Sequence, residues 1–154
     1  MKSYYLDTGV IVTPLLKNQE GSIIEQCREW LERIARGEVQ AKTSFLTWDE
    51  VIWVAGKGAE KVYNRARAVK AGELLLSLKN LEFVPVDEAV IRGAQQLIAR
   101  FGLKPRDCIH ASSALLHAQG ELVSLDSGFW KEPTLASSAG LKVTEIVTQL
   151  PPTR

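Results

Sequence analysis

Short runs rich in apolar and β-branched residues alternate along this chain with longer segments whose apolar residues recur at helical spacing. Strands separated by helices form β-α-β units, which build a parallel sheet covered by helices on both faces. The runs LVSL and FVPV are continuous rather than alternating, as expected for strands buried on both faces. The expected strands are residues 3–6, 39–44, 82–86, 121–125 and 142–146.

Capping and breaking residues mark several helix ends. Asp87 is placed to cap the N-terminus of one helix, and Pro105 suits the first turn of another. Gly102 and Gly120 follow helical patterns and end them, and Thr47 opens a further helix. The expected helices are residues 8–17, 22–36, 47–55, 60–78, 87–101 and 105–119. Together the elements predict an α/β fold, a three-layer α/β/α sandwich with a central, mainly parallel five-stranded sheet.

The chain has 154 residues, of which 45% are hydrophobic and 24% are charged. This length and composition suit one globular domain, which we place at residues 1–150, followed by a disordered tail at 151–154. The 19 basic residues nearly balance the 18 acidic ones. Because the chain is not broadly basic, any contact with nucleic acid must come from a local patch.

Cys27 and Cys108 are the only cysteines, and both lie in apolar helical patterns without CxxC spacing. We expect buried free thiols, which fit a reducing cytoplasm. The N-terminus lacks the apolar segment of a signal peptide, and no apolar run reaches membrane-spanning length. The sequence therefore predicts a cytoplasmic protein with no membrane partner.

Four carboxylates that are far apart in the chain lie at junctions of the same kind. Asp7 and Asp126 follow the first and fourth expected strands, whereas Glu50 and Asp107 lie near the starts of helices. In an open parallel sheet, strand ends and helix starts meet along one edge. Four acids on that edge would form an oxygen-lined site of the kind that binds Mg²⁺ or Mn²⁺.

Each of these acids also has an explanation that needs no metal. Asp7 and Asp126 suit turn or N-cap positions. Glu50 lies three residues after Thr47, which is the spacing of a capping box. Asp107 would be favoured in the first turn of a helix by the helix dipole. The joint placement of the four acids, more than any one of them, favours a metal site.

The segments that contain these acids resemble those of PIN-domain ribonucleases of the VapC toxin type. The similarity runs in order over essentially the whole chain, through YYLDTG, TSFLTWDEV, FVPVDEAVIRGAQQLIARFGLKPRDCIHASSALLHA and LVSLDSGF. It implies a PIN-like α/β/α sandwich and a metal-dependent endoribonuclease that hydrolyses RNA phosphodiester bonds with Mg²⁺ or Mn²⁺. The implied metal-binding and catalytic residues are Asp7, Glu50, Asp107 and Asp126.

The same resemblance implies further contacts and partners. Thr8 and Ser124 match positions at which the family often has a hydroxyl near the site, and we expect them to contact substrate. A VapB-like antitoxin and a second copy of the chain in a homodimer are the implied protein partners. The chain would then be the toxin of a VapBC-type toxin–antitoxin pair.

Basic residues and a histidine lie close to Asp107 in sequence. Arg100, Lys104 and Arg106 form a cluster that would guide phosphate toward the acids. The alternative is an exposed loop in which Arg106 pairs with a carboxylate. His110 lies one helical turn after Asp107, where it would contact substrate, carry a proton or serve as a hydrogen-bonded core residue.

Two other classes of function stay open at this level. The family often has further acids soon after the position of Asp126, whereas the nearest acid here is Glu132. A catalytically weak or inactive PIN-like RNA-binding module is therefore an alternative. A phosphoacceptor domain would carry paired acids after the first strand, and the single Asp7 disfavours that class.

Overall fold

Five short strands form one parallel sheet in the order β3-β2-β1-β4-β5 in the computed structural model. The structure describes residues 2–16, 21–59, 62–132 and 134–146. All four strand pairs are parallel. The strands are β1 (Ser3–Leu6), β2 (Gln40–Ser44), β3 (Leu81–Val84), β4 (Glu121–Ser124) and β5 (Lys142–Glu145). The expected α/β fold with a five-stranded parallel sheet is confirmed.

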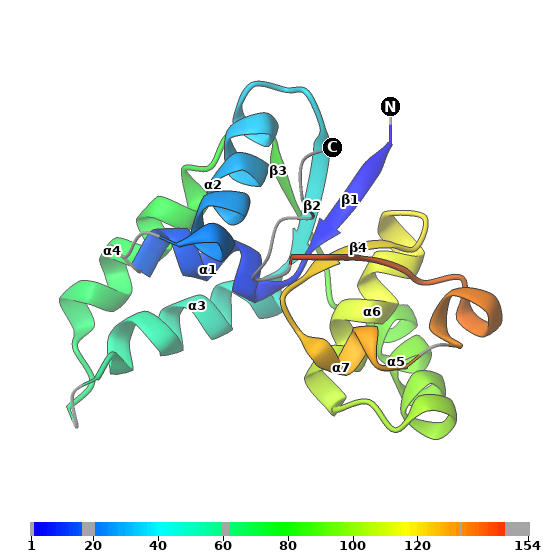
Figure 1. Ribbon diagram of the computed structural model, residues 1–154. Helices are drawn as coiled ribbons and strands as arrows, with labels where there is room; N and C mark the ends of the chain where they lie inside the picture. Colours follow the sequence, from blue (N-terminus) through cyan, green and yellow to red (C-terminus); the bar gives the residue numbers. More distant parts are fainter. Residues whose placement is uncertain (1, 17–20, 60–61, 133, 147–154) are drawn as a thin grey trace.

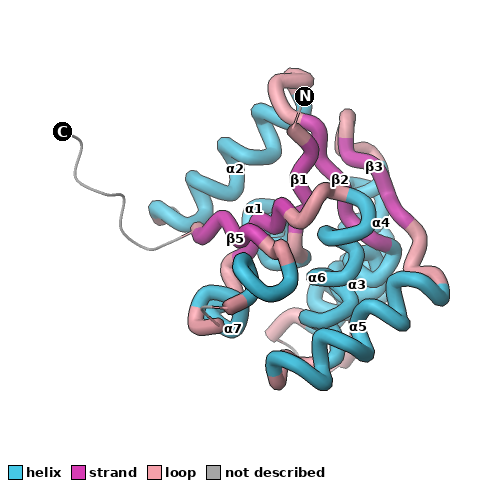
Figure 2. Tube along the Cα trace, turned by 90° about the vertical axis from the view of Figure 1, so that its right-hand side faces the viewer, coloured by secondary structure: helices cyan, strands magenta, loops and turns pink. Residues whose placement is uncertain are grey.

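Helices cover both faces of this sheet, as Figure 1 shows. The view in Figure 2 places β3 at one edge of the sheet and β5 at the other. On one face lie α1 (Thr8–Leu16), α2 (Ser22–Ala35), α3 (Phe45–Lys57) and α4 (Arg65–Leu76). On the other lie α5 (Glu88–Phe101), α6 (Pro105–His117), the short α7 (Ser127–Trp130) and the π-helical turn η1 (Leu135–Ala139).

Two hydrophobic cores separate the sheet from its helices. Tyr5 belongs to the core that also contains Cys108 of α6, and its neighbour Leu6 belongs to the core that also contains Val51 of α3. Adjacent residues of a strand face opposite sides of the sheet, and both Tyr5 and Leu6 are fully buried. The sheet is therefore covered on both faces, which explains the continuous apolar runs of the strands.

The start of α3 differs from the expected one. The helix begins at Phe45, directly after β2, with Ser44 as its N-cap residue. Thr47 therefore lies inside the first turn, where its Oγ1 lies 2.6 Å from Thr43 Oγ1. The expected capping box between Thr47 and Glu50 is wrong, because Glu50 lies too far into the helix to reach a free N–H at its start.

The start of α4 also differs, while α5 follows its prediction. Asn64 accepts a hydrogen bond from the backbone N–H of Arg67, so α4 begins after Asn64 rather than at residue 60. Asp87 caps α5 through the N–H of Val90, as expected. Both cysteines are buried free thiols. The tail at 151–154 lies outside the described residues.

No helix in the described ranges combines the length and the apolar character that crossing a bilayer requires.

Gly102 follows α5 and Gly120 follows α6, and both have a left-handed backbone conformation. The atoms around the two glycines differ. Gly120 has φ +81° between α6 and β4, and a Cβ there would collide with the carbonyl oxygen of Gly140. Gly102 has φ +61° after α5, and a Cβ there would meet no atom within 4 Å. Gly120 also accepts a hydrogen bond of 2.7 Å from Lys142 N. The turn at Gly120 thus holds β5 beside β4.

Gly120→Ala is expected to lower the free energy of unfolding by about 3 kcal/mol. A left-handed alanine costs about 1 kcal/mol and the clash with rigid backbone about 2 kcal/mol more. Gly102→Ala, which has the first cost without the second, should lose only about 1 kcal/mol. Urea denaturation of both variants measures the difference. Equal losses would contradict the close approach of Gly120 and Gly140.

Candidate active site

The C-terminal ends of β1 and β4 lie side by side in the sheet and bring Asp7 and Asp126 to one edge. Glu50 reaches this edge from α3, and Asp107 reaches it from the first turn of α6 on the other face of the sheet. The four predicted acids therefore share one cavity of about 290 Å³. Its lining residues are Asp7, Thr8, Gly9, Glu50, Asp107, His110, Leu125 and Asp126.

Asp7 is held by hydrogen bonds to both of its carboxylate oxygens. Oδ1 accepts from the backbone N–H of Thr8 at 2.8 Å, and Oδ2 accepts from Ser124 Oγ at 2.7 Å. Ser124 Oγ in turn accepts from the N–H of Asp126 at 2.9 Å. Ser124 is fully buried. Its position favours the orientation of Asp7 over the substrate contact that the resemblance implied.

Glu50 is held by Thr8 and His110 instead of by the backbone of its own helix. Thr8 Oγ1 donates to Glu50 Oε1 at 3.0 Å, and His110 Nε2 lies 2.6 Å from the same oxygen. Burial opposes ionisation of Glu50, but the hydrogen bond and charge of His110 outweigh burial and lower the pKa of the carboxyl. The surroundings of Glu50 thus favour its ionised form.

His110 is almost completely buried and faces two acids, with Nε2 3.5 Å from Asp7 Oδ1 and 2.6 Å from Glu50 Oε1. Burial is the largest single effect and lowers the pKa of His110. The hydrogen bond to Glu50 and the charge of Asp7 together raise the pKa by more, so the net shift is upward. The hydrogen-bonded alternative for His110 is therefore the one that the structure shows.

Asp107 carries the least compensated charge of the four acids. No described residue donates a hydrogen bond to its carboxylate. Burial first, and then the charges of Asp126 and Asp7, raise the pKa of Asp107 from its ordinary value of 3.8 to about 6. The helix dipole, which explained Asp107 from the sequence, does not offset these effects. The ionised site is thus short of positive charge at this position.

Asp126 caps a helix and also lines the acidic cavity. Its Oδ1 accepts from the N–H of Gly128 at 2.8 Å and caps the short helix α7, as its N-cap explanation required. It also lines the acidic cavity and a neighbouring cavity of about 420 Å³. Glu132 lines that neighbouring cavity together with Asp107 and Asp126. The acid that the sequence lacks directly after Asp126 is therefore supplied near the site by Glu132, six residues later.

The basic residues before Asp107 have separate positions. Arg106 is exposed in the first turn of α6, and among the described residues it makes no ion pair. Lys104 lines the neighbouring cavity with Asp107, whereas Arg100 donates to the carbonyl oxygen of Ser138 at 2.7 Å. Lys104 and Lys131 therefore place positive charge in the cavity beside the acids, and the charge of Arg106 acts on Glu50.

The carboxylate oxygens of the cavity are ligands that suit a hard divalent cation, although these oxygens do not surround a common point. Within residues 2–16, 21–59, 62–132 and 134–146, no three His, Cys, Asp or Glu side chains are arranged to hold a metal ion. Four carboxylates nevertheless line one cavity, and burial together with the charges of Asp126 and Asp7 raises the pKa of Asp107. Mg²⁺ and Mn²⁺ prefer oxygen ligands of this kind. The residues therefore fit the metal by charge and ligand type.

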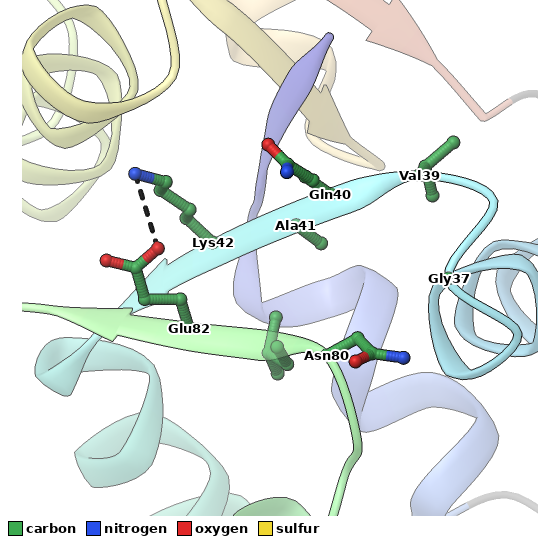
Figure 3. Close-up of a pocket in the computed structure, with 8 residues that line it drawn as sticks. Gly37, Val39, Gln40, Ala41, Lys42, Asn80 and Glu82 are labelled. Carbon is green, nitrogen blue, oxygen red and sulfur yellow. Dashed lines mark ion pairs between the residues drawn. The ribbon is translucent and has the colours of Figure 1, made fainter. Parts of the chain in front are cut away.

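A different cavity, of about 460 Å³, lies at the N-terminal ends of β2 and β3 (Figure 3). The charged residues in its wall are Lys42 and Glu82, and they pair with each other at 3.3 Å. Its wall offers no cluster of acids, so the acidic cavity at the opposite end of the strands is the better candidate for chemistry.

Tyr5 and Ser44 support the site, and the sequence did not single them out. Tyr5 Oη donates to Ser44 Oγ at 2.8 Å and lies 2.8 Å from His110 Nδ1. The available signal was a tyrosine in a buried strand two residues before an acid, because a buried tyrosine hydroxyl needs a hydrogen-bond partner. Which partner it finds depends on residues that are distant in sequence.

Comparison with known proteins identifies a family to which the sequence is similar. The model of the PIN domain family matches residues 4–131, which is most of the chain and includes the four acids. Among proteins with curated descriptions, none matches the chain significantly.

Solved structures share the fold. A chain of a toxin–antitoxin complex from Klebsiella pneumoniae is 20% identical with a TM-score of 0.63, and the match covers 96% of this chain and 100% of that one. A chain of VapBC2 from Rickettsia felis, bound to a promoter DNA fragment, is 19% identical with a TM-score of 0.64, and the match covers 93% of this chain and 98% of that one. A chain of DNA-bound VapBC from Salmonella typhimurium is 23% identical with a TM-score of 0.61, and the match covers 96% of this chain and 100% of that one. At these identities the similarity shows the fold alone.

Asp107→Asn is expected to stabilise the metal-free protein at neutral pH. Because the folded-state pKa lies above 3.8, ionisation of Asp107 costs folding free energy, a penalty that is absent below about pH 4 and complete above about pH 6. A pKa raised from 3.8 to about 6 corresponds to roughly 3 kcal/mol, which solvent screening of a half-buried carboxylate reduces to roughly 1 kcal/mol.

Denaturation in a chelating buffer at about pH 7.5 and at about pH 4 measures this gain and its loss with acid. Asp49→Asn, which removes an exposed acid of α3, is the matched control and should change the free energy of unfolding by less than about 0.5 kcal/mol. A loss of stability in Asp107→Asn at neutral pH would show that Asp107 is not under repulsion.

Proposed function

Because the chain belongs to the PIN domain family, we propose that it is a metal-dependent endoribonuclease and the toxin of a VapBC-type toxin–antitoxin pair. The observation that carries the proposal is the cavity in which the four acids meet, where no described residue donates a hydrogen bond to the carboxylate of Asp107. Uncompensated carboxylates at a sheet edge are costly to the fold, and such groups cluster at functional sites. A divalent cation would remove the cost.

Mg²⁺ or Mn²⁺ bound there would stabilise negative charge at the scissile phosphate and lower the pKa of a water. We assign Asp7 and Asp107 as the principal ligands, and Glu50 and Asp126 as ligands directly or through water. Ser124 would hold Asp7 in place through its 2.7 Å hydrogen bond. Because the ligands are not preassembled, we expect weak binding that depends on added metal.

Lys104 and Arg106 would attract the RNA backbone to the rim of the site. Lys104 lines a cavity together with Asp107, and Arg106 is exposed directly before Asp107 in the chain, so both would add positive charge near the bound phosphate. Thr8 lines the cavity, and its hydroxyl already donates to Glu50. A contact of Thr8 with substrate would therefore be made by an atom that is oriented in advance.

The proposed protein partners are a VapB-like antitoxin and a second copy of the chain. The solved structures that share the fold include toxin–antitoxin complexes. An apolar cavity of about 640 Å³ between α3 and α4, with Trp48, Val69 and Leu76 in its wall, gives this chain a surface suited to a protein partner. The buried free thiols of Cys27 and Cys108 support a place in the cytoplasm.

Cleavage of a mixed RNA pool, with and without Mn²⁺, tests the activity. The wild-type protein should cleave RNA only with added metal, and Asp7→Asn and Asp107→Asn should each reduce the rate by at least about 100-fold, because each removes a charged ligand. Asp49→Asn serves as the control with an unchanged rate.

Equal cleavage by the wild type and both site variants would contradict the proposed chemistry. RNA binding without any cleavage, in the wild type with Mn²⁺, would instead support the alternative of an inactive RNA-binding module.

A further inference from the structure

A chain of hydrogen bonds, buried except at Glu50, runs from the C-terminal end of β2 to Glu50. It begins at Ser44 of β2, passes through Tyr5 of β1 and His110 of α6, and ends at Glu50 of α3. The three distances are 2.8 Å from Tyr5 Oη to Ser44 Oγ, 2.8 Å from Tyr5 Oη to His110 Nδ1 and 2.6 Å from His110 Nε2 to Glu50 Oε1. The proposed cleavage chemistry uses only the last of these four residues.

The tyrosine end of the chain determines how the imidazole is oriented. Tyr5 has one hydroxyl proton, which it donates to Ser44 Oγ, so its oxygen is left to accept from Nδ1–H of His110. A flip of the ring would place carbon atoms against both Tyr5 and Glu50. Since His110 and Tyr5 are almost completely buried, no water replaces the lost partners. The ring is therefore held with Nε2 toward the acidic cavity.

The glutamate end of the chain leaves one oxygen unoccupied. Both His110 Nε2 and Thr8 Oγ1 contact Oε1 of Glu50, at 2.6 Å and 3.0 Å. In the part of the chain that the structure describes, no group donates to Oε2. Glu50 lines the cavity with Asp7 and Asp107. One oxygen of Glu50 is thus engaged by the protein, and the other is left for a ligand.

We propose that Tyr5 and His110 are positioning residues that hold Glu50 by Oε1 and so present Oε2 to a divalent cation in the cavity. The inference rests on the proposed function, because it assigns a metal ligand. It adds that the orientation of this ligand is set by a hydroxyl two residues before Asp7, behind the site. Hydrogen-bond partners behind a metal ligand typically change metal affinity by about 10- to 100-fold.

Binding of Mn²⁺ to the full chain, measured by isothermal titration calorimetry, is the first readout. Tyr5→Phe keeps the buried ring and removes only the hydroxyl, and it should weaken Mn²⁺ binding about 10-fold. Tyr4→Phe is the matched control, since it removes the same group one residue earlier on the opposite face of β1 and should leave the affinity unchanged.

The second readout is the ¹⁵N spectrum of the histidine side chains in metal-free protein. The chain has two histidines, so His117 serves as an internal reference. Tyr5→Phe should shift the ring nitrogens of His110 and leave those of His117 in place, whereas Tyr4→Phe should shift neither. This signal does not depend on activity or on metal, so it reports on the hydrogen-bond chain alone.

A double-mutant cycle tests whether Tyr5 acts through His110. His110→Leu alone should weaken Mn²⁺ binding by about 10-fold or more. Tyr5→Phe added to His110→Leu should cause no further loss, because the two residues act on Glu50 in series. Losses that multiply would overturn the proposal, and so would an unchanged affinity in Tyr5→Phe whose His110 signals have shifted.

The outcomes separate the inference from the function on which it rests. Mn²⁺ binding by the wild type, with an affinity unaffected by Tyr5→Phe and by His110→Leu, would overturn the positioning role and leave the proposed metal site standing. No Mn²⁺ binding by the wild type, with the His110 signals as expected, would overturn both the metal site and the presentation of Oε2.

Discussion

Four carboxylates lie together at one edge of a parallel sheet, where burial and mutual repulsion both disfavour their charges, and the other features of the site depend on this constraint. Burial first, and then the charges of Asp126 and Asp7, raise the pKa of Asp107 to about 6. A fold does not gain stability by placing acids in this way. The arrangement is understandable if a cation completes the site, since hydrogen bonds hold Asp7, Glu50 and Asp126 in place and leave Asp107 without a donor among the described residues.

The topology of the sheet creates this concentration of charge. β1 and β4 are neighbours although more than a hundred residues separate them, so Asp7 and Asp126 follow adjacent strand ends. α3 and α6 cover opposite faces and each contributes one acid from its N-terminal half. Acids that are remote in sequence therefore meet where the two helical layers approach the same edge, which is the usual place for a ligand in open α/β sheets.

Local chemistry was readable from the sequence, and non-local partners were not. The β1 strand and the Asp87 cap were predicted as the structure shows them, because both depend on neighbouring residues. Glu50 was predicted as a site acid with a capping box as its alternative explanation, and that alternative is wrong because β2 passes into α3 at Ser44 without a loop. The true partner of Glu50 is His110, sixty residues away, and only the folded chain brings the two together. The same holds for Tyr5: the sequence indicates that a buried tyrosine hydroxyl needs a hydrogen-bond partner, but it does not identify that partner.

The most direct test of the central claim is diffraction from crystals soaked in Mn²⁺, with data collected for the anomalous signal of manganese. An anomalous peak is expected in the cavity between Asp7 and Asp107, with the carboxylates drawn toward it and Glu50 Oε2 facing the ion. A cavity without an anomalous peak at saturating Mn²⁺, with the four carboxylates unmoved, would contradict the claim that a cation relieves their repulsion.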